Sequence, residues 1–379
     1  MAGKALEASQ TKKPRRTTAW GVAALILAMV LASAKAPVPN GFSAWETLAF
    51  YSGLGLQLTD LEESARPGSH TGPESLKQPP IPASMLQALP DDLSAASPDW
   101  QARLSDVFPS RPVVVRRLMQ NEIQMGGVLG LTADNLGKTY KGSQVGVFTD
   151  LITDKSVINM EFTEYTKVMQ NESKALYARA IKDSHQVMSN NVPQDWLASI
   201  ANLEWAQELS RFIKKRDGCC VLFVGSNHTF TNGHCDIGSS VFMMVQGRKR
   251  WIFFPPEDTP YLYPMPQAKN VAFNVGVDIF HPNFEQTPLF ANARGYEVVL
   301  EPGDVLFFPS MWWHAIQNLD SVTVGIDYPI WDVWGSWKRH SVLAAATLLN
   351  PKLIASMGMT MLQGKSIRDV FFAGYYKSP

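Results

Sequence analysis

Short apolar runs separated by turn residues dominate the second half of the 379-residue chain. These runs are rich in β-branched and aromatic residues, which suit the pleated surface of a sheet. In Glu301–Asp304, a proline and a glycine occupy the central positions that a type II turn favours. We therefore expect a mainly β domain. Its predicted strands are Arg111–Val115, Cys219–Gly225, Val241–Gly247, Arg250–Pro256, Tyr296–Leu300, Asp304–Pro309 and Ser321–Tyr328.

Helical patterns flank this β-rich region. Glu161–Met169 and Leu203–Lys214 predict amphipathic helices before it, and Trp337–Leu362 predicts a helical tail with an apolar face. Residues 61–100 include a stretch rich in Pro, Gly and Ser with little to bury, which indicates a linker. We expect a linker or stem with some helix over 37–108, a β-rich domain over 109–336, and a helical extension over 337–379 that offers a homodimer surface.

A basic cluster precedes an uncharged run near the N-terminus. Lys12, Lys13, Arg15 and Arg16 stand before the mostly apolar segment Ala19–Ala34. This order predicts a signal peptide or a short signal anchor over residues 1–36. The run is shorter than the roughly 20 residues that cross a bilayer upright. We expect a membrane-anchored or secretory protein on the lumenal side of the endoplasmic reticulum or Golgi, with a single N-terminal span; an organelle transit peptide is the alternative.

Charge and cysteine content narrow the function classes. Lys plus Arg and Asp plus Glu each number 34, so the formal net charge is zero. The total charge therefore favours neither nucleic acid nor an anionic membrane, and no basic patch with aromatic stacking residues supports a nucleic-acid partner. The three cysteines are Cys219, Cys220 and Cys235. Neighbouring cysteines bridge poorly and the count is odd, so we expect no disulfide framework.

Three residues of metal-binding types stand at the ends of predicted strands. His234 and Asp236 are two apart, so an extended backbone points both to one face, and His314 follows a later strand. Two histidines and a carboxylate on one face of an ion leave the other face open, as in the facial triad of non-haem Fe(II) oxygenases. Taken alone, His314 beside two tryptophans would be interpreted as a core histidine. The strand–turn–strand unit between the two histidines favours the metal site, and we assign the tryptophans to packing.

From about Ser110 to Asp332, the sequence resembles the JmjC/cupin-8 family of Fe(II)- and 2-oxoglutarate-dependent oxygenases. The segments that carry the resemblance are VLFVGSNHTFTNGHCD, VQGRKRWIFFPPEDTPYLYP and EPGDVLFFPSMWWH, in this order. In style it is nearest to the asparaginyl hydroxylase of hypoxia-inducible factor. The resemblance implies a double-stranded β-helix (a jelly-roll of the cupin/JmjC type) with flanking helices. It also implies Fe(II) held by His234, Asp236 and His314, with 2-oxoglutarate as co-substrate.

The resemblance further implies a co-substrate pocket. Lys249 falls where the family pairs a lysine with the distal carboxylate of 2-oxoglutarate, Thr231 where a threonine binds the same carboxylate, and Tyr177 where a tyrosine completes the pocket. Strand alternation would point Lys249 inward and its flanking arginines outward; the alternative is a solvated basic run. Ser240 and Asp327 stand where asparagines are expected. A carboxylate at Asp327 would repel the co-substrate unless it is paired or turned away.

These features predict an oxygenase that hydroxylates a substrate C–H bond, and the resemblance to a protein hydroxylase favours a polypeptide substrate. The long connection Pro255–Arg294 carries several aromatic residues, which either pack on one another or cover the open metal face. Two alternatives stay open. One is a metal-binding cupin-like scaffold without oxygenase activity, which Asp327 would favour. The other is a cupin isomerase or dioxygenase that uses no 2-oxoglutarate; Lys249 and Thr231 argue against both.

Overall fold

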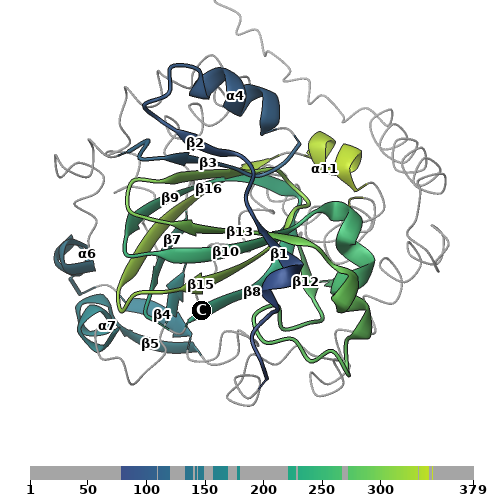
Figure 1. Cartoon of the computed structure of the whole chain (residues 1–379). Coiled ribbons are helices and arrows are strands. Elements are labelled where there is room, and N and C mark those ends of the chain that lie inside the picture. The colour runs from purple at the N-terminus through teal and green to yellow at the C-terminus, as the bar shows by residue number, and fades with distance from the viewer. Residues whose placement is uncertain are drawn as a thin grey trace, which may run out of the picture.

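Two β-sheets face each other in the computed structural model and enclose an apolar interior (Figure 1). The structure describes residues 78–108, 110–119, 133–139, 141–142, 144–148, 157–169, 177–179, 221–227, 229–266, 272–331, 333–340 and 344. Within these ranges the strands are β1 (Leu86–Ala88), β2 (Asp92–Ser94), β3 (Val113–Arg116), β4 (Gln144–Phe148), β5 (Val157–Glu161), β6 (Tyr177–Arg179), β7 (Val221–Gly225), β8 (Phe230–Asp236), β9 (Gly238–Gln246), β10 (Lys249–Phe254), β11 (Pro264–Pro266), β12 (Ala272–Val275), β13 (Gly295–Leu300), β14 (Val305–Phe308), β15 (Trp313–Asn318) and β16 (Thr323–Trp331). The helices are η4 (Ala83–Met85), α4 (Trp100–Val107), α6 (Ala133–Thr139), α7 (Phe162–Met169), η6 (Pro256–Leu262), η7 (Pro288–Asn292) and α11 (Val333–Arg339).

Successive strands of the barrel alternate between the two sheets. One sheet has the order β1-β13-β10-β15-β8-β12-β11, and the other has the order β2-β3-β14-β9-β16-β7-β6-β4-β5. The chain therefore passes from β7 to β8, β9 and β10, and later from β13 to β14, β15 and β16, changing sheets at each step. The central pairings are antiparallel. This winding is a double-stranded β-helix, so the predicted fold class is confirmed.

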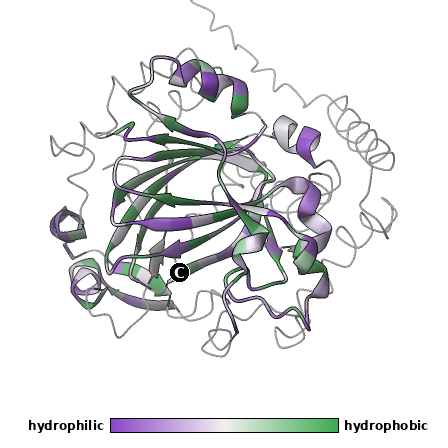
Figure 2. Cartoon of the chain, in the orientation of Figure 1, coloured by the Kyte–Doolittle hydropathy of each residue, from purple (hydrophilic) through white to green (hydrophobic). Residues whose placement is uncertain are grey.

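Both faces of the central strands are buried. Along β9, Phe242 and Met244 point into the barrel, whereas Val241, Met243 and Val245 face the cluster beneath α4 and α7. Two buried faces explain why this strand reads as a continuous apolar run rather than an alternating one. Figure 2 shows hydrophobic positions following the central strands. Each fully buried aliphatic or aromatic side chain stabilises the fold by roughly 1.5–3 kcal/mol.

Most of the predicted elements are present with small shifts at their ends. β3, β7, β9, β10, β13, β14 and β16 correspond to the seven predicted strands, and α7 corresponds to the helix predicted at Glu161–Met169. In the predicted type II turn, the Asp304 amide donates to the Glu301 carbonyl at 3.0 Å, and Gly303 has φ 97°. The predicted helix at Leu203–Lys214 lies outside the described residues. Only 337–340 and 344 of the predicted tail are described.

The described part of the predicted linker folds onto the barrel. β1 pairs in parallel with β13, and β2 pairs in parallel with β3. Ile81, Met85, Leu89 and Leu93 are at most 6% exposed. These apolar residues stand four apart among prolines and polar residues. The segment therefore shows neither the alternation nor the continuous apolar run by which a strand is predicted from sequence. Residues 78–108 thus differ from the expected linker because tertiary pairing orders them.

The connection between β10 and β13 packs largely on its own side chains. Phe273, Phe280 and Phe290 are buried in one cluster with Leu262 from η6. Its strand β12 adds to the sheet beside β8, where Asn274 is paired with His234. The aromatic residues of this connection therefore form a small core outside the barrel, next to the strand that carries two of the candidate ligands.

The predicted cellular location needs correction. Within the described ranges, no helix is long and apolar enough to cross a bilayer. The α-helices there contain seven or eight residues, whereas a span needs roughly 20. The segment Ala19–Ala34, which suggested a signal peptide or anchor, lies outside the described residues. This finding contradicts the membrane-anchored or lumenal location, and we withdraw that prediction together with the N-terminal span.

Candidate metal centre

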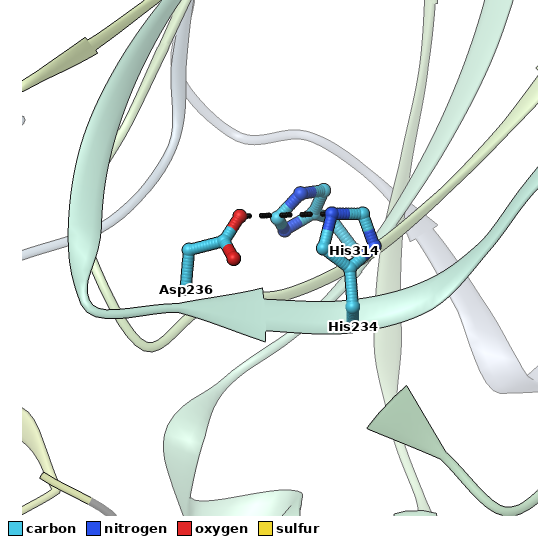
Figure 3. Close-up of side chains that lie close together, drawn as sticks. All are labelled: His234, Asp236 and His314. Atoms are coloured by element: carbon cyan, nitrogen blue, oxygen red, sulfur yellow. Dashed lines mark ion pairs between the residues drawn. The ribbon is translucent and has the colours of Figure 1, made fainter. Parts of the chain in front are cut away.

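Three side chains of metal-binding types converge inside the barrel (Figure 3). His234 and Asp236 project from β8, and His314 is the second residue of β15, directly opposite His234 in the antiparallel pair. The ligand atoms of the three residues all lie within 4.8 Å of one another. His234 Nε2 lies 3.6 Å from Asp236 Oδ2, and the two imidazole centroids are 4.2 Å apart. The structure thus brings together the three residues predicted as metal ligands.

A bulge in β8 adjusts the face on which its residues project. On β15 the paired residues His314 and Ile316 are two apart, whereas their partners His234 and Thr231 are three apart. In a regular strand, residues three apart such as Thr231 and His234 would point to opposite faces. The extra residue of the bulge turns Thr231 back to the inner face, where His234 also points. Phe230 confirms this geometry, because its ring packs outside the barrel against Phe280 at 5.1 Å. Thr231 therefore shares the inner face with the candidate ligands.

Gly233 lies within this bulge, where the outer face of β8 is tightly covered. A Cβ atom at this position would lie 2.5 Å from both Ile279 Cδ1 and Val275 Cγ2. Real Cβ atoms do not approach neighbours so closely, so the outer connection fits against β8 only because this residue has no side chain. The glycine just before His234 thus lets β12 and its neighbours cover the ligand strand.

The hydrogen bonds of the two imidazoles leave one nitrogen of each available for a metal ion. His234 Nδ1 lies 2.7 Å from the Asn232 carbonyl oxygen, and His314 Nδ1 lies 2.9 Å from the Trp312 carbonyl oxygen. A carbonyl only accepts, so we assign the proton to Nδ1 in both rings, which leaves the Nε2 lone pairs free. Burial, followed by the charge of His234, holds the pKa of His314 well below its usual range. Two neutral imidazoles and one carboxylate suit Fe(II).

Lys249 is a buried cationic residue inside the barrel. Its side chain is 1% exposed, and its Nζ donates to Asn318 Oδ1 at 2.5 Å. Burial lowers the pKa of Lys249 to about 7. The neighbouring arginines point outward: Arg248 pairs with Asp320, and Arg250 pairs with Glu297. The alternation expected along this strand is therefore observed.

Asn318 links Lys249 to the rest of the polar interior, and sequence reasoning missed it. Its Nδ2 donates to Thr229 Oγ1 at 2.5 Å, and the Thr229 hydroxyl in turn donates to the Ser226 carbonyl at 2.6 Å. Asn318 stands four residues after His314 on β15, so the two side chains share the inner face. That even spacing was the available signal, but it required β15 to be recognised as a strand.

Comparison with known proteins identifies the family. The cupin-like domain family matches residues 105–331, which is more than half of the chain. The chain belongs to the cupin-like family of JmjC type. The fold, the order of the strands and the position of the candidate metal centre inside the barrel agree with this membership.

Named relatives match only part of this cupin-like chain. HSPB1-associated protein 1 of Rattus norvegicus is 44% identical over 109 residues, covering 28% of this chain and 22% of that protein. The Homo sapiens protein of that name is 42% identical over 109 residues, with the same coverage. The tRNA wybutosine-synthesizing protein 5 of Homo sapiens is 39% identical over 130 residues, covering 32% of this chain and 39% of that protein. The chain thus matches less than half the length of each relative.

Thr231 and Tyr177 are the other two residues predicted for the co-substrate pocket. The structure describes the side chain of Thr231 but only the backbone of Tyr177. Thr231 is half-buried on the inner face of β8, as the bulge requires. The backbone of Tyr177 lies on β6, where it pairs with Gly225 of β7 and Phe148 of β4. The tyrosine thus lies on a strand of the nine-stranded sheet, and its side chain belongs to the part of the chain that is not described.

Asp327 occupies the inner face of β16, next to the metal centre. Ser240 Oγ donates to its Oδ2 at 3.4 Å, whereas its buried Oδ1 has no hydrogen-bond partner among the described residues. Burial raises the pKa of Asp327 to about 8, and the charge of Asp236 adds to this effect. Burial thus favours the neutral form of this carboxyl in the metal-free protein, which lessens the repulsion expected from a carboxylate.

Proposed function

We propose that this cupin-like chain is an Fe(II)- and 2-oxoglutarate-dependent oxygenase that hydroxylates a C–H bond of its substrate. The convergence of His234, Asp236 and His314 within ligand distance, inside a barrel of this family, carries the proposal. Bound Fe(II) and 2-oxoglutarate would supply oxidation by dioxygen, with conversion of the keto acid to succinate and carbon dioxide. The boundaries 109–336 for the catalytic domain and 337–379 for the C-terminal extension remain proposals, with β1 and β2 added to the two sheets from the preceding segment.

The residues of the chain have separate tasks in this proposal. The carbonyls of Asn232 and Trp312 fix the two imidazoles with Nε2 free. Lys249 pairs with Asn318, four residues from His314 along the β10–β15 ladder, and would bind the distal carboxylate of 2-oxoglutarate together with Thr231. A buried carboxylate needs a cation or hydrogen bonds to offset its desolvation. The surrounding apolar side chains of the barrel would exclude water from the reacting atoms.

The alternative of a scaffold without oxygenase activity depends on whether the barrel admits the co-substrate. Asp327 favoured that alternative as long as it was treated as a carboxylate. The raised pKa of Asp327 instead supports a neutral acid at pH 7, which can donate a hydrogen bond as an asparagine amide does. The buried, inward-pointing Lys249 supports an anionic ligand. Both observations favour the oxygenase.

A polypeptide is the substrate class that we propose. The chain has zero net charge, so it lacks the surplus of cationic residues with which proteins neutralise nucleic-acid phosphates. The name of HSPB1-associated protein 1 also indicates a protein partner for that relative. An RNA substrate is the second candidate, because other relatives are named tRNA wybutosine-synthesizing protein 5. We further propose a homodimer through the C-terminal helices, which sedimentation of the purified chain would test.

The substrate class can be tested with mixtures. The purified chain, Fe(II) and 2-oxoglutarate are incubated in parallel with a cellular protein extract and with total RNA. Mass spectrometry then searches for a gain of about 16 Da, one oxygen atom. The variant Asp236→Ala is the control in both arms. We expect a variant-sensitive gain on peptides. A gain confined to nucleosides would reject the polypeptide substrate and leave the oxygenase in place.

A further inference from the structure

Helix α11 follows β16 and lies at one side of the barrel, beyond the ends of the strands (Figure 1). The end of β16 pairs with the start of β9, so that Trp331 lies opposite Gly238. The helix therefore starts beside the corner where β8 ends at Asp236 and β9 begins. Trp337 packs against the same outer cluster that contains Met311.

The first contact of α11 reaches the residue after Asp236. The Ser336 hydroxyl donates to the Ile237 carbonyl at 2.6 Å, and both residues are fully buried. A buried carbonyl with no partner is costly, so this hydrogen bond fixes the backbone at the corner between β8 and β9. Asp236 is the last residue of β8, and its backbone position depends on that corner.

The second contact reaches the corner that precedes His314. Arg339 Nη1 donates to Ser310 Oγ at 2.6 Å, and the Ser310 amide donates to Ser239 Oγ at 3.0 Å. The next amide, of Met311, donates to the Asp236 carbonyl at 2.9 Å. One helix thus holds both corners, and the corners are also bonded to each other.

The second corner contains a backbone conformation that needs support. Met311 has φ 66°, in the left-handed region that residues with a side chain rarely adopt, and it is 1% exposed. Such a conformation persists only where the surroundings hold it. His314 follows three residues later, so relaxation of Met311 would move His314 relative to Asp236.

We propose that Ser336 and Arg339 are positioning residues that set the distance between Asp236 and His314 and thereby the affinity of the centre for its metal ion. The inference rests on the proposed function, because it concerns the same three ligands. Loss of a direct hydrogen-bond partner of a metal ligand typically changes metal affinity by about tenfold to a hundredfold, and we expect these two contacts, which act through the backbone, to lie near the lower end of that range. By reciprocity, metal binding stabilises the docked position of α11.

The test uses the full chain loaded with Co(II), a spectroscopic substitute for Fe(II). Titration gives the dissociation constant, and the visible ligand-field spectrum reports the geometry of the centre. The variants are Ser336→Ala, Arg339→Met and Arg339→Lys. Lys338→Ala, an exposed position in the same helix, is one control. Thr287→Val is the second control, since it removes a buried hydroxyl that donates to a carbonyl at 2.8 Å far from α11 in sequence.

We expect Ser336→Ala and Arg339→Met each to weaken Co(II) binding by about tenfold and to change the spectrum. Arg339→Lys should retain most of the wild-type affinity for Co(II), because lysine keeps a cationic donor at this position. Both controls should bind as the wild type does, although Thr287→Val lowers the melting temperature of the metal-free protein as Ser336→Ala does. A purely structural role would leave the affinity and spectrum of Ser336→Ala and Arg339→Met unchanged, which would overturn the inference.

The two levels of failure can be told apart. If the wild type binds Co(II) in a manner that requires His234, while Ser336→Ala and Arg339→Met bind equally well, only the positioning role falls. If the wild type binds no more Co(II) than His234→Ala does, the metal centre itself is rejected, and the inference falls with it. Should Ser336→Ala fail to fold, Arg339→Met decides the outcome, because Arg339 is only partly buried.

Discussion

Replacing Lys249 by methionine tests the co-substrate pocket with little change in side-chain volume. The ammonium group is buried against Asn318 on the inner face of the barrel. Methionine keeps an unbranched apolar chain there but cannot bind a carboxylate. Arg250→Met is the matched control, because Arg250 is the next residue on the same strand and points outward to Glu297.

The magnitude follows from the loss of one charge-assisted contact. Such a contact contributes roughly 1.5–3 kcal/mol, so Lys249→Met should weaken 2-oxoglutarate binding by about ten- to 150-fold. The metal affinity should stay within about twofold, because Lys249 is not among the candidate ligands. Isothermal titration of the Mn(II)-loaded protein with 2-oxoglutarate measures the dissociation constant without turnover.

The pH dependence gives a second signature. Burial lowers the pKa of Lys249 to about 7 in the free protein, and only the protonated amine pairs with a carboxylate. Below pH 7 the proton is already present; above pH 7 binding must take up a proton. Loss of this proton alone should therefore raise the dissociation constant of the wild type by about fivefold between pH 7 and pH 8, and Lys249→Met should show a much smaller slope. Equal affinity, or an equal slope, in wild type and Lys249→Met would refute this role of Lys249.

Three further predictions concern the metal centre and the bulge of β8. Asp236→Ala should abolish binding of Mn(II) at micromolar concentration, as measured by elemental analysis after gel filtration; full metal content in that variant would contradict the assignment. Thr231→Val should weaken 2-oxoglutarate binding by about tenfold in the same titration, and an unchanged constant would place its hydroxyl outside the pocket. Gly233→Ala should lower the free energy of unfolding by about 1–3 kcal/mol in urea, because the added Cβ meets Ile279 and Val275 at 2.5 Å; unchanged stability would contradict this packing.

The strands with apolar residues on both faces could be predicted from the sequence, and those around the site largely could not. β9 and β14 read as continuous apolar runs because they are buried on two sides. β8, with the sequence FTNGHCD, has polar residues and a glycine. Its inner face carries the candidate ligands, and its bulge needs a residue without a side chain, so local propensity argues against a strand that tertiary pairing forms. Local rules fail here because the site imposes its own requirements.

His234 and Asp236 could be predicted from their local spacing, whereas His314 required the predicted strand–turn–strand unit between the two histidines. The direction of Lys249 followed from strand alternation. Asn318 was missed, because its even spacing from His314 is informative only once β15 is recognised as a strand that pairs with β10. The raised pKa of Asp327 could not be found either, because it results from burial beside Asp236, which only the folded barrel creates. Long-range pairing and desolvation are therefore the two properties that the sequence pattern did not reveal.

Succinate release by the purified full chain tests the central claim most directly. The chain is supplied with Fe(II), 2-oxoglutarate, ascorbate and a cellular protein extract passed through a desalting column, and succinate is quantified by mass spectrometry. We expect the wild type to release succinate in an Fe(II)-dependent manner, and Asp236→Ala to release none above the extract alone. Release by the wild type no greater than that by Asp236→Ala would contradict an oxygenase and favour the metal-binding scaffold.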